Sequence, residues 1–385
     1  MKKSLLALAA MGAFAGAAQA QSSVSVYGLI DGGYNNLTTT ESTAAGVKQY
    51  TQGAGFTGGE SASSRIGFRG VEDLGQGLSA NFNLEYGIAA GTGTTTVASD
   101  ATGAAQGSAT GVRTSIVGLA HKQYGSVAVG RQLTGMHAIL AGDVWGGNNM
   151  VGDITYSDFN STAAGAGVTA SGRVNFVTTR SSNMLTYISP NVMGLTLRAE
   201  YGNTQTTTAN QPGVQFSLGG LYATYNYGPI TVKAGQIQAK NNEAIAAAAV
   251  YAANKTTING ANVMYQAKGL TVQYTIGNNK TEALAAGGVA TLTSGVRAQK
   301  LSASYQIGAF LPFVQYGQGG TEGGRAVGAA NTSTTDKGLQ VGSEYALSKR
   351  SSLYAAYGNQ ERALKTNSSA KTERTEMSIG LRHTF

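Results

Sequence analysis

The sequence has no cysteine, little charge and no long apolar run after its first 20 residues. The lack of cysteine excludes a fold held together by disulfides. Charged residues make up 12% of the chain, against roughly 25% in ordinary soluble proteins. Beyond residue 20 there is no stretch of about 18 apolar residues, so no membrane-spanning helix is expected there. The chain must hold its fold by other means, and closed backbone hydrogen bonding is sufficient.

The first 20 residues have the pattern of a secretory signal peptide. Two lysines precede an apolar run over residues 5–18, and Ala18-Gln19-Ala20 has the small residues of a cleavage site. The run is shorter than the roughly 20 residues of a membrane helix. We expect cleavage after Ala20, which removes residues 1–20 and leaves residues 21–385 as one domain. Cleavage lowers the formal net charge from +8 to +6, because two lysines are lost.

The end of the chain alternates between two faces. One parity is largely apolar: Met377, Ile379, Leu381, His383 and Phe385. The other parity is polar or small: Glu376, Ser378, Gly380, Arg382 and Thr384. Successive side chains of a strand point to opposite faces. The pattern is therefore typical of a strand whose outer face meets lipid, with a terminal aromatic ring at the membrane interface.

The same alternation recurs through the chain, for example over residues 78–86, 270–276 and 300–307. The predicted strands are 23–34, 61–71, 78–89, 111–120, 125–133, 178–189, 194–202, 217–227, 229–238, 258–267, 269–278, 297–307, 309–318, 336–347, 351–360 and 374–385. A barrel of 16 to 18 strands leaves an aqueous channel. With 55 glycines and 19 tyrosines in a charge-poor exported chain, we predict an all-β fold. It is a transmembrane antiparallel β-barrel of about 16 strands in the outer membrane of a Gram-negative cell.

Short and long connections alternate between these strands. The short turns are 72–77, 121–125, 189–191, 227–229, 267–269 and 347–350. The long segments are 35–60, 90–110, 203–216, 239–256, 278–296, 319–335 and 361–373, and an Ala-rich run at 244–253 is compatible with a short helix. Short periplasmic turns and long extracellular loops are typical of outer-membrane barrels. The longest connection, 134–177, is expected to fold into the barrel, since a structureless loop of that length is hard to stabilise.

Several short motifs are spread along the chain: Ser64–Gly70 with Glu72–Gly75, Val117–Leu119, Gly125 with Val129–Gln132, Ser182-Asn183 with Tyr187–Pro190, and Gly380–Phe385. Together they resemble the motifs of the general porins of Gram-negative β-proteobacteria. The resemblance covers the whole chain in order. It implies a homotrimer of 16-stranded barrels, each with its own pore narrowed by the third long loop. It also implies that Phe385 is an assembly signal for the barrel-assembly machinery. Outer-membrane lipids are expected partners of such a barrel, and its net positive charge is expected to attract anionic solutes and the phosphates of lipopolysaccharide.

Basic residues on the inner face are the candidate pore-lining groups, because rings of Arg or Lys select for anions. Arg65 and Arg69 share the parity opposite to Ile66 and Phe68. The other candidates flank the longest connection or alternate with apolar neighbours: Arg131, Arg180, Lys233 and Arg382. The alternative for each is a structural ion pair, or a side chain that snorkels to an interface.

The longest connection carries three acidic candidates, Asp143, Asp153 and Asp158. The resemblance implies that acidic loop residues face basic wall residues across a constriction and create a transverse field. The alternative is a local role, since aspartate commonly hydrogen-bonds the backbone of turns.

Other chemistry finds little support in the sequence. Residues 53–58 match G-x-G-x-x-G but precede a strand, so a dinucleotide site is not expected. His121, His137 and His383 lie far apart in the chain without metal-ligand spacing, and G-x-S-x-G does not occur. No basic run with interleaved aromatics suggests nucleic acid. We therefore expect no enzyme activity, cofactor or metal.

The sequence thus predicts a passive diffusion channel for small hydrophilic solutes and ions, with weak anion selectivity. A channel specific for phosphate or a dicarboxylate is the first alternative. An outer-membrane lipase or protease is the second. The long loops are also compatible with a role as adhesin or phage receptor.

Overall fold

The structure is a computed structural model. It describes residues 23–43, 45–58, 61–88, 111–142, 144–145, 150–155, 180–208, 211–245, 250–284, 290–323 and 333–385. The predicted signal peptide, Asp143 and Asp158 lie outside these residues. Within the described part, no helix is long and apolar enough to cross a membrane.

Seventeen strands and one short helix make up the described structure. The strands are β1 (Ser23–Ser42), β2 (Lys48–Thr57), β3 (Arg65–Gly75), β4 (Leu78–Gly87), β5 (Val112–His121), β6 (Gly125–Leu133), β7 (Arg180–Ile188), β8 (Leu195–Thr208), β9 (Gln211–Tyr227), β10 (Ile230–Ile245), β11 (Val250–Ala267), β12 (Leu270–Leu284), β13 (Ala290–Tyr305), β14 (Phe310–Gly323), β15 (Thr334–Ala346), β16 (Ser351–Leu364) and β17 (Lys371–Thr384). The helix is α2 (Gly135–Leu140), which follows β6.

The sheet closes on itself between its first and last strands. β1 pairs antiparallel with β17 from Leu29 opposite Thr384 to Ser42 opposite Lys371. Below this ladder, Gly28 and Phe385 exchange backbone hydrogen bonds of 3.0 and 3.1 Å. Closure lets backbone groups of the wall find partners inside the sheet, which a lipid environment requires. The last strand of the chain thus pairs with the first.

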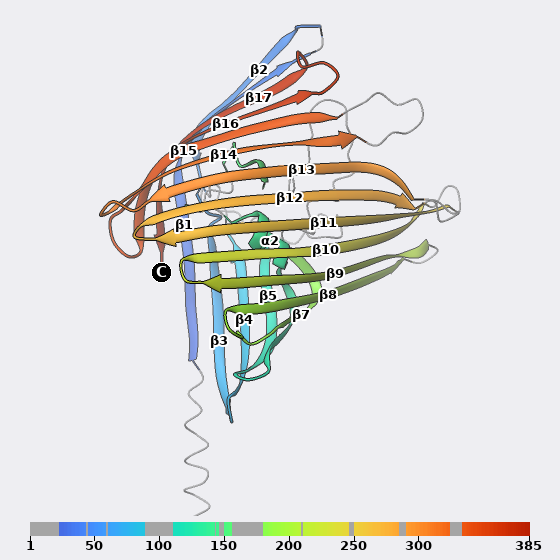
Figure 1. The fold of residues 1–385 in the computed structure, drawn as a ribbon, viewed down its shortest axis with the longest axis vertical. Helices are drawn as coiled ribbons and strands as arrows, with labels where there is room; N and C mark the ends of the chain where they lie inside the picture. The colour runs from blue at the N-terminus through green and yellow to red at the C-terminus, as the bar shows by residue number, and fades with distance from the viewer. Residues whose placement is uncertain are drawn as a thin grey trace, which may run out of the picture.

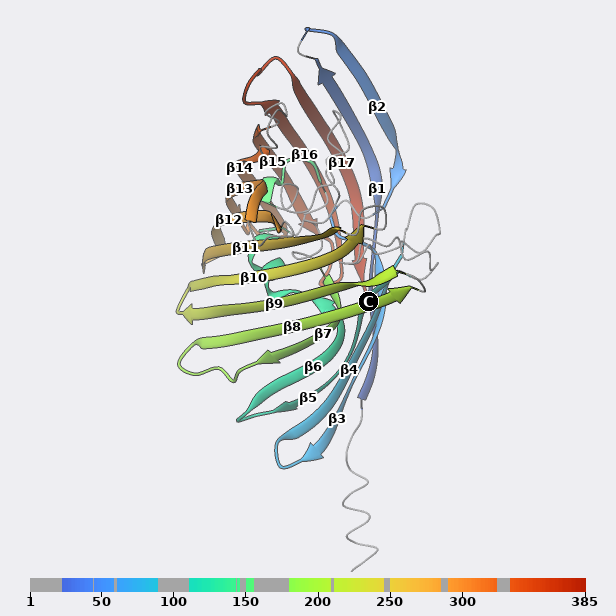
Figure 2. The same cartoon turned by 90° about the vertical axis from the view of Figure 1, so that its right-hand side faces the viewer.

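β2 and β3 occupy one position in the barrel. β2 forms a hairpin with residues 33–42 of β1, and β3 pairs with residues 23–29 of the same strand. Figure 2 shows β2 running beside the upper part of β1. The seventeen strands therefore fill sixteen positions, which confirms the predicted barrel of about 16 strands.

The alternation read from the sequence is confirmed in the wall. On β17, Met377 and Ile379 are both 60% exposed on the outer face, while Glu376 and Ser378 are buried on the inner face. In Figure 1, β10 to β13 cross the picture while β1 and β3 stand nearly upright. Strands of a closed barrel are tilted, so those on its opposite sides cross in projection.

Several segments predicted as long loops are instead strands. The segment 35–60 holds the end of β1 and the hairpin strand β2. The segment 203–216 holds the end of β8 and the start of β9. In the Ala-rich run 244–253, residues 244–245 end β10 and residues 250–253 begin β11, so the short helix is wrong for these residues, and 246–249 lie outside the described residues. The physical reason is that backbone pairing continues beyond the lipid-facing band, where polar residues hide the alternation.

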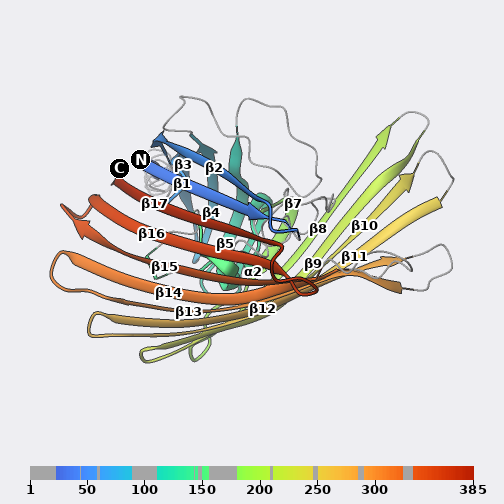
Figure 3. The ribbon, with the colours of Figure 1, turned by 90° about the horizontal axis from the view of Figure 1, so that it is seen from above.

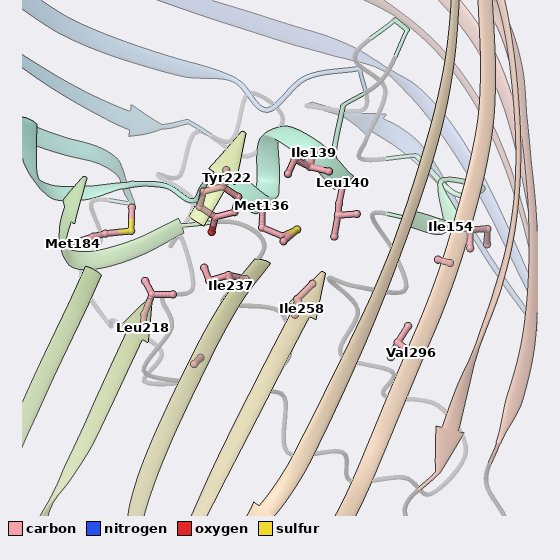
Figure 4. Packing of buried hydrophobic residues seen from close by; sticks show 12 residues of the cluster. Met136, Ile139, Leu140, Ile154, Met184, Leu218, Tyr222, Ile237, Ile258 and Val296 are labelled. Atoms are coloured by element: carbon pink, nitrogen blue, oxygen red, sulfur yellow. The ribbon is translucent and has the colours of Figure 1, made fainter. Parts of the chain in front are cut away.

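Apolar packing lies inside the barrel, against the segment that follows β6. Met136, Ile139 and Leu140 of α2 are at most 2% exposed. They belong to a cluster with inner-face residues of β7 to β13, drawn in Figure 4: Met184, Leu218, Tyr222, Ile237, Ala239, Ile258, Val296 and Ala298, with Ile154. Trp145 and Met150 form a second cluster with residues of β14 and β16. Seen from above, α2 lies between β5 and the β9–β12 side of the wall (Figure 3).

Candidate functional site

A cavity of about 580 Å³ opens on the inner face between the first strands of the barrel and α2. Its charged and polar lining comes from neighbouring strands: Tyr27 of β1, Arg65 of β3, Asn83 and Glu85 of β4, Arg113 and Thr114 of β5, and Arg180 of β7. His137 of α2 completes this polar lining. The cavity therefore lies where the wall meets the segment that enters the barrel after β6.

Tyr27 organises one side of the cavity. Its hydroxyl donates to the Asn83 amide oxygen at 2.8 Å and to the Glu85 carboxylate at 3.1 Å. The ring occupies the space over Gly67, where an added Cβ would lie 2.3 Å from the Tyr27 Cζ atom. The Arg69 guanidinium stands 5.1 Å from the centre of the same ring, a cation–π distance. Arg69 is thereby fixed on the inner face, as its parity predicted.

One carboxylate faces several guanidinium groups in this cavity. Glu85 binds Arg113 at 2.7 Å and approaches Arg65 at 3.8 Å, and Arg180 lines the cavity as well. Three guanidinium groups and one carboxylate thus line it. A cavity lined by more cations than anions has a positive electrostatic potential, and the low-dielectric walls around it concentrate the electric field.

Arg113 is the member of this group that sequence reasoning missed. Regular alternation in β5 would place it with Val117 and Leu119, which are exposed on the outer face. The pairing of β4 with β5 shifts between Glu85 and Tyr86, so Thr114 faces Glu85 and Arg113 is the extra residue. Such a bulge re-aims a side chain, and it leaves no signal in the hydrophobic pattern.

Arg131 is held away from this cavity. Its Nε donates to the Val112 carbonyl at 2.8 Å and its Nη1 to the Ser182 hydroxyl at 2.9 Å. The pairing of β6 with β7 shifts register between Gly130 and Gln132, so alternation does not decide where Arg131 points, and Arg131 is not among the residues that line the cavity. The structure therefore does not bring Arg131 together with Arg65.

Lys233 and Arg382 lie on the inner face at other points of the wall. Lys233 donates to the Ala138 carbonyl of α2 at 3.4 Å. Arg382 donates to the Ser61 hydroxyl at 2.9 Å and forms an ion pair with Glu344. Both positions match the predicted parity, and both side chains bind structural partners there.

Asp153 is buried rather than exposed to the lumen. Its carboxylate binds Lys300 of β13 at 2.8 Å, and both side chains are 1% exposed. The Thr155 hydroxyl also donates to Asp153 at 3.0 Å. The sequence predicts Asp153 to be a constriction residue, whereas the contact it makes joins the inner segment to the wall.

Wall side chains bind the backbone of the inner segment at several further points. Glu200 accepts the Gly135 N–H at 2.7 Å at the start of α2, where a carboxylate complements the helix dipole. Further along, Gln273 donates to the Gly142 carbonyl at 2.8 Å. Glu376 accepts the Val151 N–H at 2.6 Å, and Gln340 donates to the Val151 carbonyl at 3.0 Å. These contacts give hydrogen-bond partners to backbone N–H and C=O groups of the inner segment that no helix or strand pairs.

A second inward excursion joins β2 to β3. Asp31 is fully buried on β1 and accepts the N–H groups of Ser61 and Ala62, each at 2.8 Å. The Tyr354 hydroxyl donates to the same carboxylate at 2.8 Å. The backbone N–H of Asp31 in turn binds the Ser64 hydroxyl. This buried carboxylate explains how residues 61–64 stay against the inner wall between two strands.

Metal binding finds no support in the described part of the chain, which holds no group of three or more His, Cys, Asp or Glu side chains suited to a metal ion. The inner face instead offers guanidinium groups, carboxylates and amides in fixed positions. Such groups bind and orient small polar solutes.

Comparison with known proteins agrees with this architecture. A family model described as Gram-negative porin matches residues 7–363. The chain belongs to the Gram-negative porin family. It is 28% identical to an outer membrane porin protein of Bordetella pertussis over the full length of both chains. It is 34% identical to outer membrane porin protein 32 of Delftia acidovorans, over 62% of this chain and 60% of that protein.

Solved structures show the same fold. An anion-selective porin from Comamonas acidovorans superposes with a TM-score of 0.65 at 22% identity, covering 95% of this chain and all of that one. OmpT of Vibrio cholerae gives 0.61 at 16% identity, covering 94% and 98%. Family membership and the closed barrel place this porin in the outer membrane and point to a channel rather than an enzyme.

The buried pair of Asp153 and Lys300 gives a test of how the inner segment is held. Asp153→Asn leaves the Lys300 ammonium buried without its carboxylate partner, which costs about 3–5 kcal/mol of unfolding free energy. Urea unfolding of the porin folded in lipid vesicles measures the loss. Glu282→Gln breaks an ion pair with Lys280, whose side chain is 57% exposed, and should cost under about 1 kcal/mol. Equal unfolding midpoints for the two variants would contradict the anchoring role.

Proposed function

We propose that this porin is a passive diffusion channel for small hydrophilic solutes and ions, weakly selective for anions. The observation that carries the proposal is the cavity lined by Arg65, Arg113 and Arg180 with Glu85 as the acidic partner. Basic groups in a narrow aqueous path attract anions and repel cations. Arg65 and Arg113 share the single carboxylate of Glu85, whereas Lys300 and Arg362 on the inner face each bind an aspartate, Asp153 and Asp336.

The segment 134–177 is the proposed constriction of the pore. Support comes from its described parts, residues 134–142, 144–145 and 150–155, which pack on inner-face side chains and bind them through their backbone. Asp153 acts in this proposal as an anchor. Asp143 and Asp158 keep their proposed role as acidic residues opposite the basic wall, and both lie outside the described residues.

A channel specific for phosphate or a dicarboxylate is the second candidate. The convergence of three guanidinium groups on one cavity favours it, because Arg binds such oxyanions through two hydrogen bonds at once. The two candidate functions differ in how conductance depends on solute concentration. A specific channel is blocked by micromolar to millimolar phosphate or succinate, whereas a diffusion channel conducts in proportion to salt.

The proposed assembly is a homotrimer with one pore in each barrel. The fold likeness to OmpT of Vibrio cholerae, one structure of which is described as a trimer form, supports it. Outer-membrane lipids and lipopolysaccharide are the proposed surroundings, and the barrel-assembly machinery is the proposed partner of Phe385.

Neutralising the basic cavity tests the selectivity. The triple variant Arg65→Gln, Arg113→Gln, Arg180→Gln should lower the anion-to-cation permeability ratio at least about twofold, because the positive potential in the lumen is removed. Reversal potentials in a potassium chloride gradient across a planar bilayer measure the ratio, and a trimer shows conductance steps in threes. As a control, Lys122→Gln, Lys268→Gln and Lys349→Gln remove equal charge at exposed short turns. A cation preference of the unmodified porin, or an unchanged ratio in the cavity variant, would contradict the proposal.

Deletion of Phe385 tests the assembly signal. We expect several-fold less folded porin in outer-membrane fractions, measured by heat-modifiable mobility on gels. Gly28→Ala distinguishes the role of Phe385 in closing the barrel from its role as an assembly signal. The added Cβ would lie 2.3 Å from the Phe385 Cζ atom and disturb the seam, while the terminal residue itself is retained. It should lower the unfolding midpoint with little loss of yield. Gly32→Ala, on the same strand with open space, is the control. If the Phe385 deletion variant gave as much folded porin as the unmodified chain, Phe385 would not be an assembly signal.

A further inference from the structure

The short helix α2 has one side against the barrel wall and one side toward the cavity. Met136, Ile139 and Leu140 are buried on the wall side. Figure 4 shows Met136 and Leu140 pointing from α2 toward the strands of the wall. At 3.6 residues per turn, His137 and Ala138 then lie on the other side of the helix. Ala138 is exposed, and His137 is partly exposed and lines the cavity. His137 is therefore the titratable side chain that α2 presents to the lumen.

The start of α2 is held by side chains, and this fixes the position of His137. The Thr134 hydroxyl accepts the backbone N–H of His137 at 3.3 Å. The Glu200 carboxylate on the wall accepts the N–H of Gly135 at 2.7 Å. The ring of Tyr222 lies over Gly135, where an added Cβ would be 2.5 Å from the Tyr222 Cδ2 atom. A backbone anchored at these points keeps the imidazole at the cavity.

The charged groups around His137 are mostly cationic in the described part of the chain. The charged and titratable residues that line the same cavity are Tyr27, Arg65, Glu85, Arg113, Arg180 and Phe385, which carries the terminal carboxylate. On the wall side of α2, Lys233 donates to the Ala138 carbonyl, and Arg198 and Glu200 pair with each other near the helix start. Cations outnumber carboxylates at the cavity. A positive charge on His137 therefore adds to a potential that is already positive.

We propose that His137 is a further residue that sets the charge selectivity of the pore. Histidine changes its charge between about pH 5 and 8. When the imidazole is protonated, it joins the guanidinium groups of Arg65, Arg113 and Arg180 at the cavity, so anions are attracted and cations repelled more strongly. When it is neutral, the guanidinium groups act without it. Anion selectivity therefore rises as the pH falls. The inference rests on the proposed diffusion channel, because it assigns a further residue to the cavity of that channel.

Reversal potentials of the folded porin at pH 8 and pH 5 test the proposal. They are measured across a planar bilayer in a potassium chloride gradient near 0.1 M, where the screening length is about 10 Å. The anion-to-cation permeability ratio of the unmodified porin should be at least about twofold higher at pH 5. His137→Gln should keep the pH 8 ratio at both pH values, because its side chain stays neutral. His137→Lys should have the higher ratio already at pH 8, because its ammonium group is charged throughout.

The other two histidines of the chain supply matched controls. His121 ends β5 and stacks on Tyr124, and His383 hydrogen-bonds the Ser351 hydroxyl at 2.9 Å, so neither lines the cavity. His121→Gln and His383→Gln should keep the pH effect in full. Glu85→Gln separates the histidine from the carboxylate, because protonation of Glu85 would also favour anions. This variant should raise the ratio at both pH values and still show the difference between them.

Three results would overturn the role of His137. They are equal permeability ratios of the unmodified porin at pH 8 and pH 5, a pH effect that survives in His137→Gln, and loss of the effect in either histidine control. Heat-modifiable mobility on gels shows that each variant is folded before it is recorded. A porin that prefers cations at both pH values would contradict the proposed function. A shift toward anions at pH 5 that His137→Gln abolishes would support the role of His137 even then.

Discussion

Backbone hydrogen bonding across the seam between β1 and β17 is the interaction on which the rest of the structure depends. In lipid an unpaired peptide group costs several kcal/mol, so an open sheet edge is not viable. The ladder from Leu29 to Ser42 and the pair of bonds between Gly28 and Phe385 close that edge. Closure also encloses a lumen, and the side chains of the inner parity can then act on solutes.

The lumen is shaped by a segment that the wall holds through polar anchors. Glu200, Gln273, Gln340 and Glu376 bind its backbone, and Lys300 binds its Asp153. Apolar residues on the inner face would be out of place in a water-filled barrel. Here they cover the apolar side of α2. The remaining inner surface, on the side of β3 to β7, keeps its guanidinium groups at the cavity.

Much of the wall could be predicted from the sequence, because side-chain alternation and short turns are local signals. The terminal strand and the parity of its outward-facing side chains are confirmed. The hairpin of β2 could not be predicted, because residues 35–60 are mostly polar or small and lack the apolar alternation of the wall. Nor could the inward turn of Arg113, which depends on a bulge, or the partner of Asp153, which lies 147 residues away on β13. The sequence did hold one signal for a segment packed inside the barrel. Ile237 and Ile258 are apolar residues at positions where alternation places side chains on the inner face.

The central claim is that residues 150–155 rest on the inner wall of the conducting porin. An ideal Cβ at Gly317 lies 3.0 Å from the Ile154 Cβ, so an outward shift of under about 1 Å brings the two Cβ atoms to the roughly 3.8 Å of a disulfide. The chain has no other cysteine. Oxidation of the Gly317→Cys, Ile154→Cys variant should cross-link it, and single-channel conductance should stay the same before and after. Failure to cross-link, or a several-fold change in conductance on cross-linking, would contradict the account.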